Sequence, residues 1–147
     1  MSAVEAAALD ETAFADELAF AEALSVRAGE LLMDRYERVE RVDYKSARDV
    51  VTEVDHLSEE LIIEAIRARF PDDGILAEES GEHVAVAGAS PTSGQGRVWI
   101  VDPLDGTINY ANGIPYFCVS IGLAVDGLPA VGVIHDPSRH ETFAATA

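Results

Sequence analysis

The stretch Trp99-Ile-Val-Asp-Pro-Leu-Asp-Gly-Thr-Ile-Asn-Tyr110 joins an apolar run to two acids and a set of turn-forming residues. Its apolar start predicts a buried strand, which delivers Asp102 to its end. Pro103 favours a turn at that point, and Gly106 tolerates backbone angles that a side chain would forbid. We therefore expect a turn from Asp102 to Asp105 that brings the two carboxylates close together.

Such a pair of carboxylates needs a shared proton or a cation. At about 4 Å and an effective dielectric constant near 20, two negative charges repel by roughly 4 kcal/mol. Because the ligands would be oxygens, with no His or Cys inside the stretch, Mg²⁺ is the expected ion. Gly106 and Thr107 would begin a helical turn whose amide groups can hold a phosphate oxygen. The stretch therefore predicts a phosphoryl-transfer site.

Other interpretations of the two acids fit less well. An EF-hand loop fails on spacing, because the twelfth position counted from Asp102 is Gly113 and not Glu. A phosphatase with an aspartyl nucleophile would need its first Asp at Pro103. A purely structural role, as an Asp-Pro turn that ends a strand, stays open as an alternative to a functional site.

The segments around this stretch predict two helices followed by a sheet. The first helix runs from Thr12 to Val39, and Arg41 to Val51 is expected to be an extended loop or hairpin. A second helix starts near Thr52 and ends at Phe70 to Gly74. Short strands are expected at Gly74–Ala77, Val98–Val101 and Glu141–Ala145. Two more strands, Phe117–Val125 and Pro129–Ile134, are expected to form a hairpin across Asp126-Gly127. The segment from Val84 to Gly96 is expected to be a surface loop.

Composition narrows the class of protein. The 147 residues are 48% hydrophobic and 25% charged, which suits a single globular domain. The 27 acidic residues against 10 basic ones disfavour nucleic acid and anionic membranes as partners. The N-terminus does not resemble a secretory signal, so a cytoplasmic location is expected. Cys118 is expected to be a buried strand residue, and the four histidines are expected at the surface or in turns.

Three segments of the chain resemble the inositol monophosphatase family. The stretch from Trp99 is similar to its signature W-x-V-D-P-[LI]-D-G-T-x-N-[FY], followed by a proline that Pro115 supplies. Lys45 to Asp55 is similar to K-x-x-x-D-x-V-T-x-x-D, and Ala77 to Ser80 is similar to the family's G-E-E segment, with Ala77 in place of Gly. The three segments occur in the family's order.

The resemblance implies a fold and an activity. The fold would be an α/β layered sandwich of the sugar-phosphatase type, with two N-terminal helices packed on a largely antiparallel sheet. The activity would be Mg²⁺-dependent hydrolysis of a small phosphate monoester such as inositol 1-phosphate by a metal-activated water. Histidinol phosphate, fructose 1,6-bisphosphate and phosphoadenosine phosphate are alternative substrates. Homodimers and inhibition by lithium are also implied.

The resemblance also assigns roles to residues. Glu78, Asp102 and the carbonyl of Leu104 would bind one Mg²⁺, and Asp102 and Asp105 a second one. The resemblance implies catalytic roles for Asp55, Thr107 and Glu78. It also implies that the backbone of Gly106 and Thr107 binds the phosphate. Bland alternatives remain: Thr52 with Asp55 also fits an N-terminal helix cap, which the residues alone favour, and Glu78-Glu79 also fits a solvated turn.

The family pattern continues beyond what this chain contains. Members of the family are longer and carry a W-D-x-A-A-G-like segment with a further metal-binding Asp, and nothing in residues 1–147 matches it. We therefore expect the chain to be the N-terminal metal-binding half of such a domain, without the C-terminal half. The alternative is a catalytically incomplete family member that acts as a metal-binding or interaction remnant.

Overall fold

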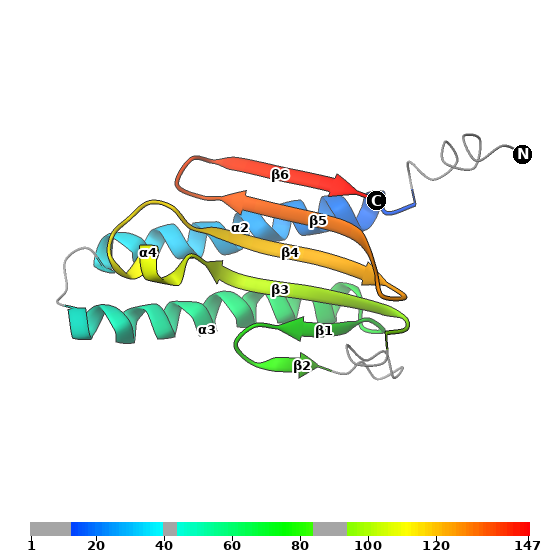
Figure 1. Ribbon diagram of the computed structural model, residues 1–147, viewed down its shortest axis with the longest axis horizontal. Helices are drawn as coiled ribbons and strands as arrows, with labels where there is room; N and C mark the ends of the chain where they lie inside the picture. The colour runs from blue at the N-terminus through cyan, green and yellow to red at the C-terminus, as the bar shows by residue number, and fades with distance from the viewer. Residues whose placement is uncertain (1–12, 40–43, 84–93) are drawn as a thin grey trace, which may run out of the picture.

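Two long helices and a six-stranded sheet form the layers of the molecule (Figure 1). The computed structural model describes residues 13–39, 44–83 and 94–147, without the side chains of residues 37–39 and 44–50. Its elements in chain order are α2 (Ala15–Val39), α3 (Tyr44–Arg69), β1 (Gly74–Ala77), β2 (Gly81–His83), β3 (Arg97–Asp105), α4 (Thr107–Ala111), β4 (Cys118–Val125), β5 (Leu128–Asp136) and β6 (Glu141–Thr146).

The sheet is mixed but mostly antiparallel. Its strand order is β2-β1-β3-β4-β5-β6, and only the β1–β3 pair is parallel within the described part of the chain. The predicted fold class is confirmed: α2 and α3 lie on one face of this sheet (Figure 1). None of the helices that the structure describes has the length and apolar character needed to cross a bilayer.

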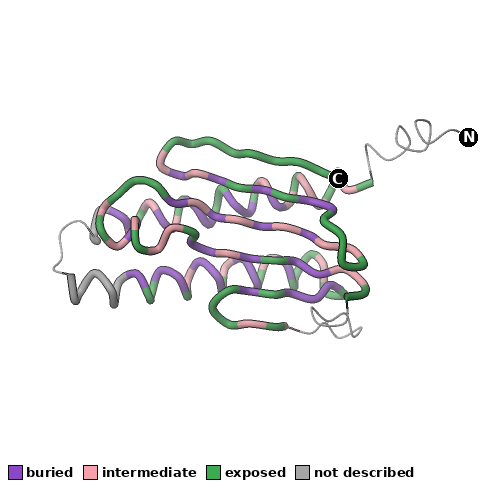
Figure 2. The backbone as a smooth tube through the Cα atoms, in the orientation of Figure 1, coloured by how far each residue is buried: buried purple, intermediate pink, exposed green. Residues whose placement is uncertain are grey.

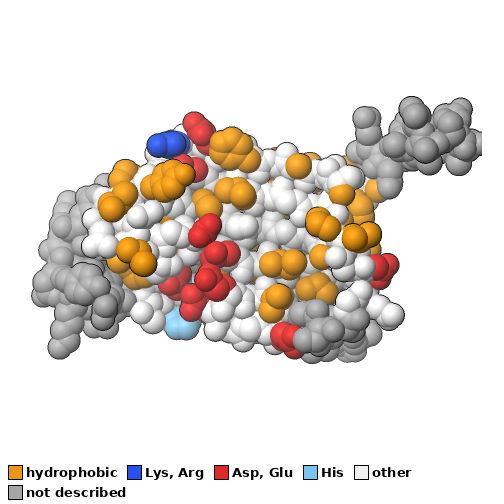
Figure 3. Space-filling model, in the orientation of Figure 1, with side chains coloured by type: hydrophobic (Ala, Val, Ile, Leu, Met, Phe, Trp, Pro, Cys, Tyr) orange, Lys and Arg blue, Asp and Glu red, His pale blue; other side chains and the backbone are white. Residues whose placement is uncertain are grey.

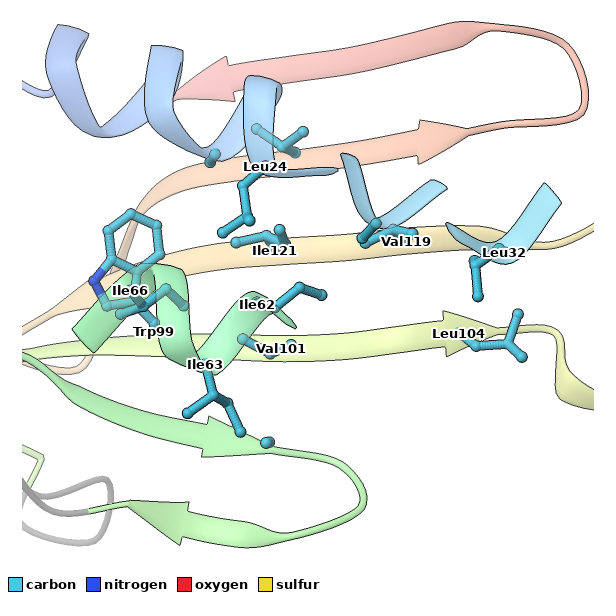
Figure 4. Close-up of a cluster of buried hydrophobic side chains, with 14 of the residues drawn as sticks. Leu24, Leu32, Ile62, Ile63, Ile66, Trp99, Val101, Leu104, Val119 and Ile121 are labelled. Carbon is cyan, nitrogen blue, oxygen red and sulfur yellow. The ribbon is translucent and has the colours of Figure 1, made fainter. Parts of the chain in front are cut away.

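The core lies between the helices and the sheet. Buried and exposed positions alternate along the central strands, because successive side chains of a strand point to opposite faces (Figure 2). Figure 4 shows Ile62 and Ile66 of α3 beside Trp99 and Val101 of β3, all of them almost fully buried. The opposite face of the sheet leaves several large apolar side chains exposed, namely Leu76, Ile100, Ile134 and Phe143.

Helix α3 begins earlier than the sequence predicts. It starts at Tyr44, so the loop or hairpin expected up to Val51 is wrong from Tyr44 onward, while residues 41–43 lie outside the described residues. A helix propagates through backbone hydrogen bonds and needs no apolar stripe in its first turns. The capping interpretation of Thr52 and Asp55 is also wrong, because both residues lie inside the helix.

Most of the remaining elements follow the predictions, but the short strand β2, which pairs with β1, was not predicted. The β4–β5 hairpin turns at Asp126 and Gly127, with φ of 50° and 80°, and β6 is present. Thr12 and residues 84–93 of the expected surface loop lie outside the described residues. The surface assignment of His135 is wrong, because its side chain is buried within β5 and contacts the Thr142 hydroxyl at 2.8 Å. These elements place the ends of β1 and β3 together beside α3.

Candidate metal and phosphate site

A β-bulge carries the two acids of the central stretch. Asp102 pairs with Ser120 and Asp105 pairs with Cys118, so three residue steps on β3 face two on β4. Strand β3 therefore continues to Asp105, and the predicted turn from Asp102 is wrong. Pro103 suits this position because a bulge leaves a backbone group out of the ladder, and proline has no N–H to pair.

The bulge changes which way the acids point. Residues three apart in a regular strand face opposite sides of a sheet. Here Pro103 and Leu104 are both buried, and the extra residue returns Asp105 to the side on which Asp102 lies. The Leu104 amide donates to Asp102 Oδ1 at 3.2 Å and holds this local conformation. The proximity predicted for the two carboxylates thus arises from a bulge.

Parallel pairing brings Glu78 to the same place. Ala77 at the end of β1 pairs with Val101, so the next residues along the two segments are Glu78, directly after β1, and Asp102 on β3. The Glu78 amide donates to the Val101 carbonyl at 3.1 Å and extends this alignment past the end of the strand. The parallel pair therefore places Glu78 beside Asp102.

The carboxyl groups of Glu78 and Asp102 lie close enough together to share a proton when one of them is protonated. Partial burial, this interaction with Glu78 and the nearby charges of Glu78 and Asp105 raise the pKa of Asp102 to about 7. The raised pKa reflects the cost of bringing several negative charges together.

Asp55 is the third part of the acidic group. It lies on α3 with 7% of its surface exposed, and its Oδ1 atom has no hydrogen-bond partner among the described residues. Burial raises the pKa of Asp55 to about 7, helped by the charges of Glu79, Glu78 and Glu59. A buried carboxylate oxygen without a partner is costly, so it indicates a ligand-binding role more than a structural one.

Gly106 and Thr107 begin the short helix α4. Gly106 has a φ of 90°, and a Cβ atom there would come within 2.9 Å of the Tyr116 carbonyl oxygen. This position therefore needs glycine for its conformation and for its close contact. The Thr107 hydroxyl donates to the Leu104 carbonyl at 3.1 Å, so the structure brings together two of the predicted site residues.

Two residues near the site were missed by the sequence reasoning. Ser58 and Glu59 on α3 are almost fully buried, and they contact the two segments that carry the acids. The sequence contains a sign of the buried Ser58: it lies four residues after Val54 and four before Ile62, so it falls on the apolar face of the helix. Cys118 is only half-buried, unlike the prediction, and its Sγ lies 3.8 Å from Asp105 Oδ2.

The donor set fits a hard cation. Figure 3 shows acidic side chains gathered in one patch on the sheet face opposite the helices. Among the described residues, no group of three His, Cys, Asp or Glu side chains is placed so that it could hold a metal ion as it stands. The buried oxygen of Asp55 has no partner among these residues, and the raised pKa values of Asp55 and Asp102 indicate that a positive charge would be favourable here. Oxygen donors of this kind suit Mg²⁺.

A hollow of about 490 Å³ opens beside the acids. Asp105 and Gly106 form one wall of it, and its other walls include Tyr116, Arg139 and Phe143. Asp136 and Glu141 also line the hollow, so it combines three acidic side chains with aromatic surface and the Arg139 guanidinium. Its size suits a small organic molecule.

Comparison with known proteins identifies the family. The family model described as "Inositol monophosphatase family" matches residues 15–147. The chain is 44% identical over 121 residues to "Nus factor SuhB" from Pasteurella multocida. This match covers 81% of this chain and 43% of that protein. It is 42% identical over 119 residues to "Inositol-1-monophosphatase" from Synechocystis, covering 80% of this chain and 39% of that protein.

Solved structures agree with this assignment. The inositol monophosphatase from Anabaena has the same fold, with a TM-score of 0.74 and 38% identity, over 92% of this chain and 45% of that one. The chain spans less than half the length of the relatives that it matches. The chain belongs to the inositol monophosphatase family.

Proposed function

We propose that this chain provides the metal-binding half of an active site that hydrolyses a small phosphate monoester with Mg²⁺. The observation that carries the proposal is that the parallel β1–β3 pair brings Glu78 beside Asp102, near the buried and unpartnered oxygen of Asp55. Carboxylates brought together from separate segments at a cost in stability are typical of catalytic sites. Membership of the inositol monophosphatase family supports the choice of reaction.

The residues would share two metal positions. Glu78, Asp102 and the Leu104 carbonyl are the proposed ligands of one Mg²⁺, and Asp102 and Asp105 the proposed ligands of a second. The Leu104 carbonyl already accepts one hydrogen bond from Thr107, and its second lone pair can face a cation. Bound Mg²⁺ would activate the attacking water and neutralise the phosphate charge.

The other residues would act on the water and the phosphate. The Asp55 carboxylate and the Thr107 hydroxyl would orient the attacking water, and Asp55 would accept its proton. The new P–O bond forms as the bond to the alcohol oxygen breaks, so the products are inorganic phosphate and an alcohol. The amide groups of Gly106 and Thr107, at the start of α4, would hold phosphate oxygens.

The hollow beside Asp105 suggests where the alcohol part of the substrate lies. Inositol 1-phosphate is the proposed substrate, and the name of the Synechocystis relative supports it. Tyr116 and Phe143 offer aromatic surface to a ring, and Arg139 offers a donor to hydroxyl or phosphate oxygens. Histidinol phosphate, fructose 1,6-bisphosphate and phosphoadenosine phosphate need the same metal chemistry and remain alternative substrates.

A second candidate is that this half of a family domain serves as a metal-binding or interaction module. The Pasteurella relative is named as a Nus factor, which is a different kind of role from the hydrolase of Synechocystis. The absence of a nucleic-acid or membrane partner, the homodimer, lithium sensitivity and the cytoplasmic location all stay predictions. The net charge of −17 supports the first of these, because it repels polyanions.

Calorimetric titration with Mg²⁺ tests the proposal. The chain should bind Mg²⁺ at millimolar concentration or below, and Asp102→Asn should weaken binding by at least about tenfold. The matched control is Glu64→Gln, which removes one negative charge from an exposed position of α3. Phosphate release from inositol 1-phosphate by the chain joined to the second half of a relative would then test hydrolysis. No heat of Mg²⁺ binding in the unsubstituted chain would overturn the metal site.

A further inference from the structure

Two adjacent side chains of α3 connect the acid-bearing segments to the same helix. The Ser58 hydroxyl donates to the Pro103 carbonyl at 3.0 Å, inside the bulge between Asp102 and Asp105. The Glu59 carboxylate accepts from the amides of Glu79 and Ser80 at 2.9 and 3.0 Å, in the turn that follows Glu78. One side chain therefore reaches β3 and its neighbour reaches the end of β1.

Both side chains are buried where polar groups are costly. Ser58 has 0% of its surface exposed and Glu59 has 3%. An acid this deeply buried is rarely found without a specific partner. Both of its oxygens accept backbone N–H groups, which is the arrangement that a carboxylate satisfies and an amide does not.

We propose, on the basis of the proposed function, that Ser58 and Glu59 are positioning residues that set the distance between Glu78 and Asp102. The β1–β3 ladder ends at Ala77 and Val101. Beyond it, the Glu78 amide donates to the Val101 carbonyl and β3 stays paired with β4, and Ser58 and Glu59 add direct links from both segments to α3. Asp55 lies one helical turn before Glu59 on α3. The same helix therefore also sets the position of Asp55 relative to Glu78 and Asp102.

This arrangement would hold the two segments in place. Glu78 and Asp102 repel each other when both are ionised, so links to a common helix would keep them from moving apart. Anchoring both segments to adjacent residues of a rigid helix keeps the carboxylates at a separation that a cation can bridge. Partners behind the ligands commonly change metal affinity by about 10- to 100-fold when removed.

The test compares isosteric variants of neighbouring acids in the full chain. Glu59→Gln keeps the shape of the side chain but turns an NH₂ group toward one of the two amides. We expect Mg²⁺ affinity to fall about tenfold by calorimetry. We also expect faster hydrogen exchange at the Glu79 or Ser80 amide. Ser58→Ala should give a smaller loss of affinity, because it removes a single neutral hydrogen bond.

Two controls separate positioning from general stability. Glu60→Gln makes the same charge change at the adjacent exposed position and should bind Mg²⁺ like the unsubstituted chain. Asp73→Asn disturbs a buried acid that contacts Arg97 and Trp99, so it should lower the melting temperature without changing Mg²⁺ affinity.

The outcomes have distinct meanings. If Glu59→Gln binds Mg²⁺ as tightly as the unsubstituted chain, the positioning role is overturned and the proposed function stands. If Asp73→Asn loses affinity to the same degree, affinity follows stability and the positioning role is again overturned. An unsubstituted chain that does not bind Mg²⁺ overturns the proposed function together with the positioning role. Unchanged exchange at Glu79 and Ser80 overturns the anchoring itself.

Discussion

The two ends of the parallel β1–β3 pair use buried acids in opposite ways. At the start of the strands, Asp73 accepts from the Arg97 guanidinium at 3.0 Å and from the Trp99 indole at 2.9 Å, so each of its oxygens has a donor. At the far end, Asp102 lies close to the carboxyl group of Glu78, and an oxygen of Asp55 has no partner among the described residues. The first acid has the contacts of a structural residue, whereas the second group has the unmet charges and the unpartnered oxygen that we propose serve a ligand.

The difference follows from what the sequence supplies near each acid. Arg97 and Trp99 are two positions apart on β3, so their side chains lie on the same face of the strand. Both contact Asp73, which precedes β1. The site end has acids from α3, β1 and β3, and its near charges are negative. Proteins commonly violate such rules of charge pairing at functional sites.

The largest effect is expected at the fully paired end. Asp73→Ala leaves the buried indole N–H of Trp99 and the Arg97 guanidinium without their acceptor. We expect the free energy of unfolding to fall by about 3 kcal/mol. Urea unfolding followed by Trp99 fluorescence measures it. Magnesium affinity should stay unchanged, and a loss of less than about 1 kcal/mol would show that this end is not held by the acid.

A smaller effect is expected from the backbone of the site end. Gly106→Ala places a Cβ atom on a residue with a φ of 90° and 2.9 Å from the Tyr116 carbonyl oxygen. The free energy of unfolding should fall by about 2 kcal/mol. The control is Gly132→Ala on β5, where a Cβ atom would meet nothing within 4 Å. Equal stability of the two variants in urea would contradict the need for glycine at position 106.

Removing an acid from the site should stabilise the protein. Asp102→Asn abolishes one of the repelling carboxylates, so the metal-free chain should gain about 1 kcal/mol in the free energy of unfolding. The variant should also lose the rise in melting temperature that Mg²⁺ causes in the unsubstituted chain. Thermal unfolding in EDTA and in Mg²⁺ measures both changes. A destabilised variant in EDTA would place Asp102 among the structural acids, with Asp73.

The smallest expected effect is that the stability gained by Asp102→Asn in EDTA depends on pH. The pKa of Asp102 is about 7 in the folded chain and 3.8 is its ordinary value, so the folded state holds the proton more tightly. Folded-state stability from this group is therefore lost as pH rises from about 4 to about 7. The advantage of Asp102→Asn in EDTA should grow over that range and then level off.

A second group, His135, also makes the stability of the chain depend on pH. Burial lowers the pKa of His135, so this side chain reduces stability when pH falls below its ordinary value of 6.5. Taking the difference between the unsubstituted chain and Asp102→Asn removes this contribution, because His135 is present in both. A difference that stays constant from pH 4 to pH 8 would contradict the raised pKa of Asp102.

Much of the fold and the identity of the site acids could be predicted from the sequence. Apolar runs of strand length and the Asp126-Gly127 turn predict the β4–β5 hairpin, because these signals act over short distances. The acids of the central stretch stand out because Asp102 and Asp105 lie among turn residues behind a buried strand. The family resemblance then connects them with Glu78 and Asp55.

The remaining features depend on contacts between distant segments. The bulge between Asp102 and Asp105 exists only relative to β4, since a bulge is defined by the number of residues on the partner strand. The early start of α3 at Tyr44 has only a short apolar pattern, Tyr44, Ala47 and Val51, which fits helical spacing but does not by itself fix where the helix begins. The anchoring by Ser58 and Glu59 requires knowing that α3 passes behind the ends of β1 and β3.

Paramagnetic broadening by Mn²⁺ tests most directly whether the acids of three segments surround one site. Mn²⁺ accepts the same oxygen ligands as Mg²⁺. In a nuclear magnetic resonance titration, the amide signals of Asp55, Glu78, Asp102, Leu104 and Asp105 should broaden together at substoichiometric Mn²⁺, and excess Mg²⁺ should restore them. Signals around Asp73 should remain sharp. Broadening confined to one of the three segments, or spread over the acidic surface, would contradict the account.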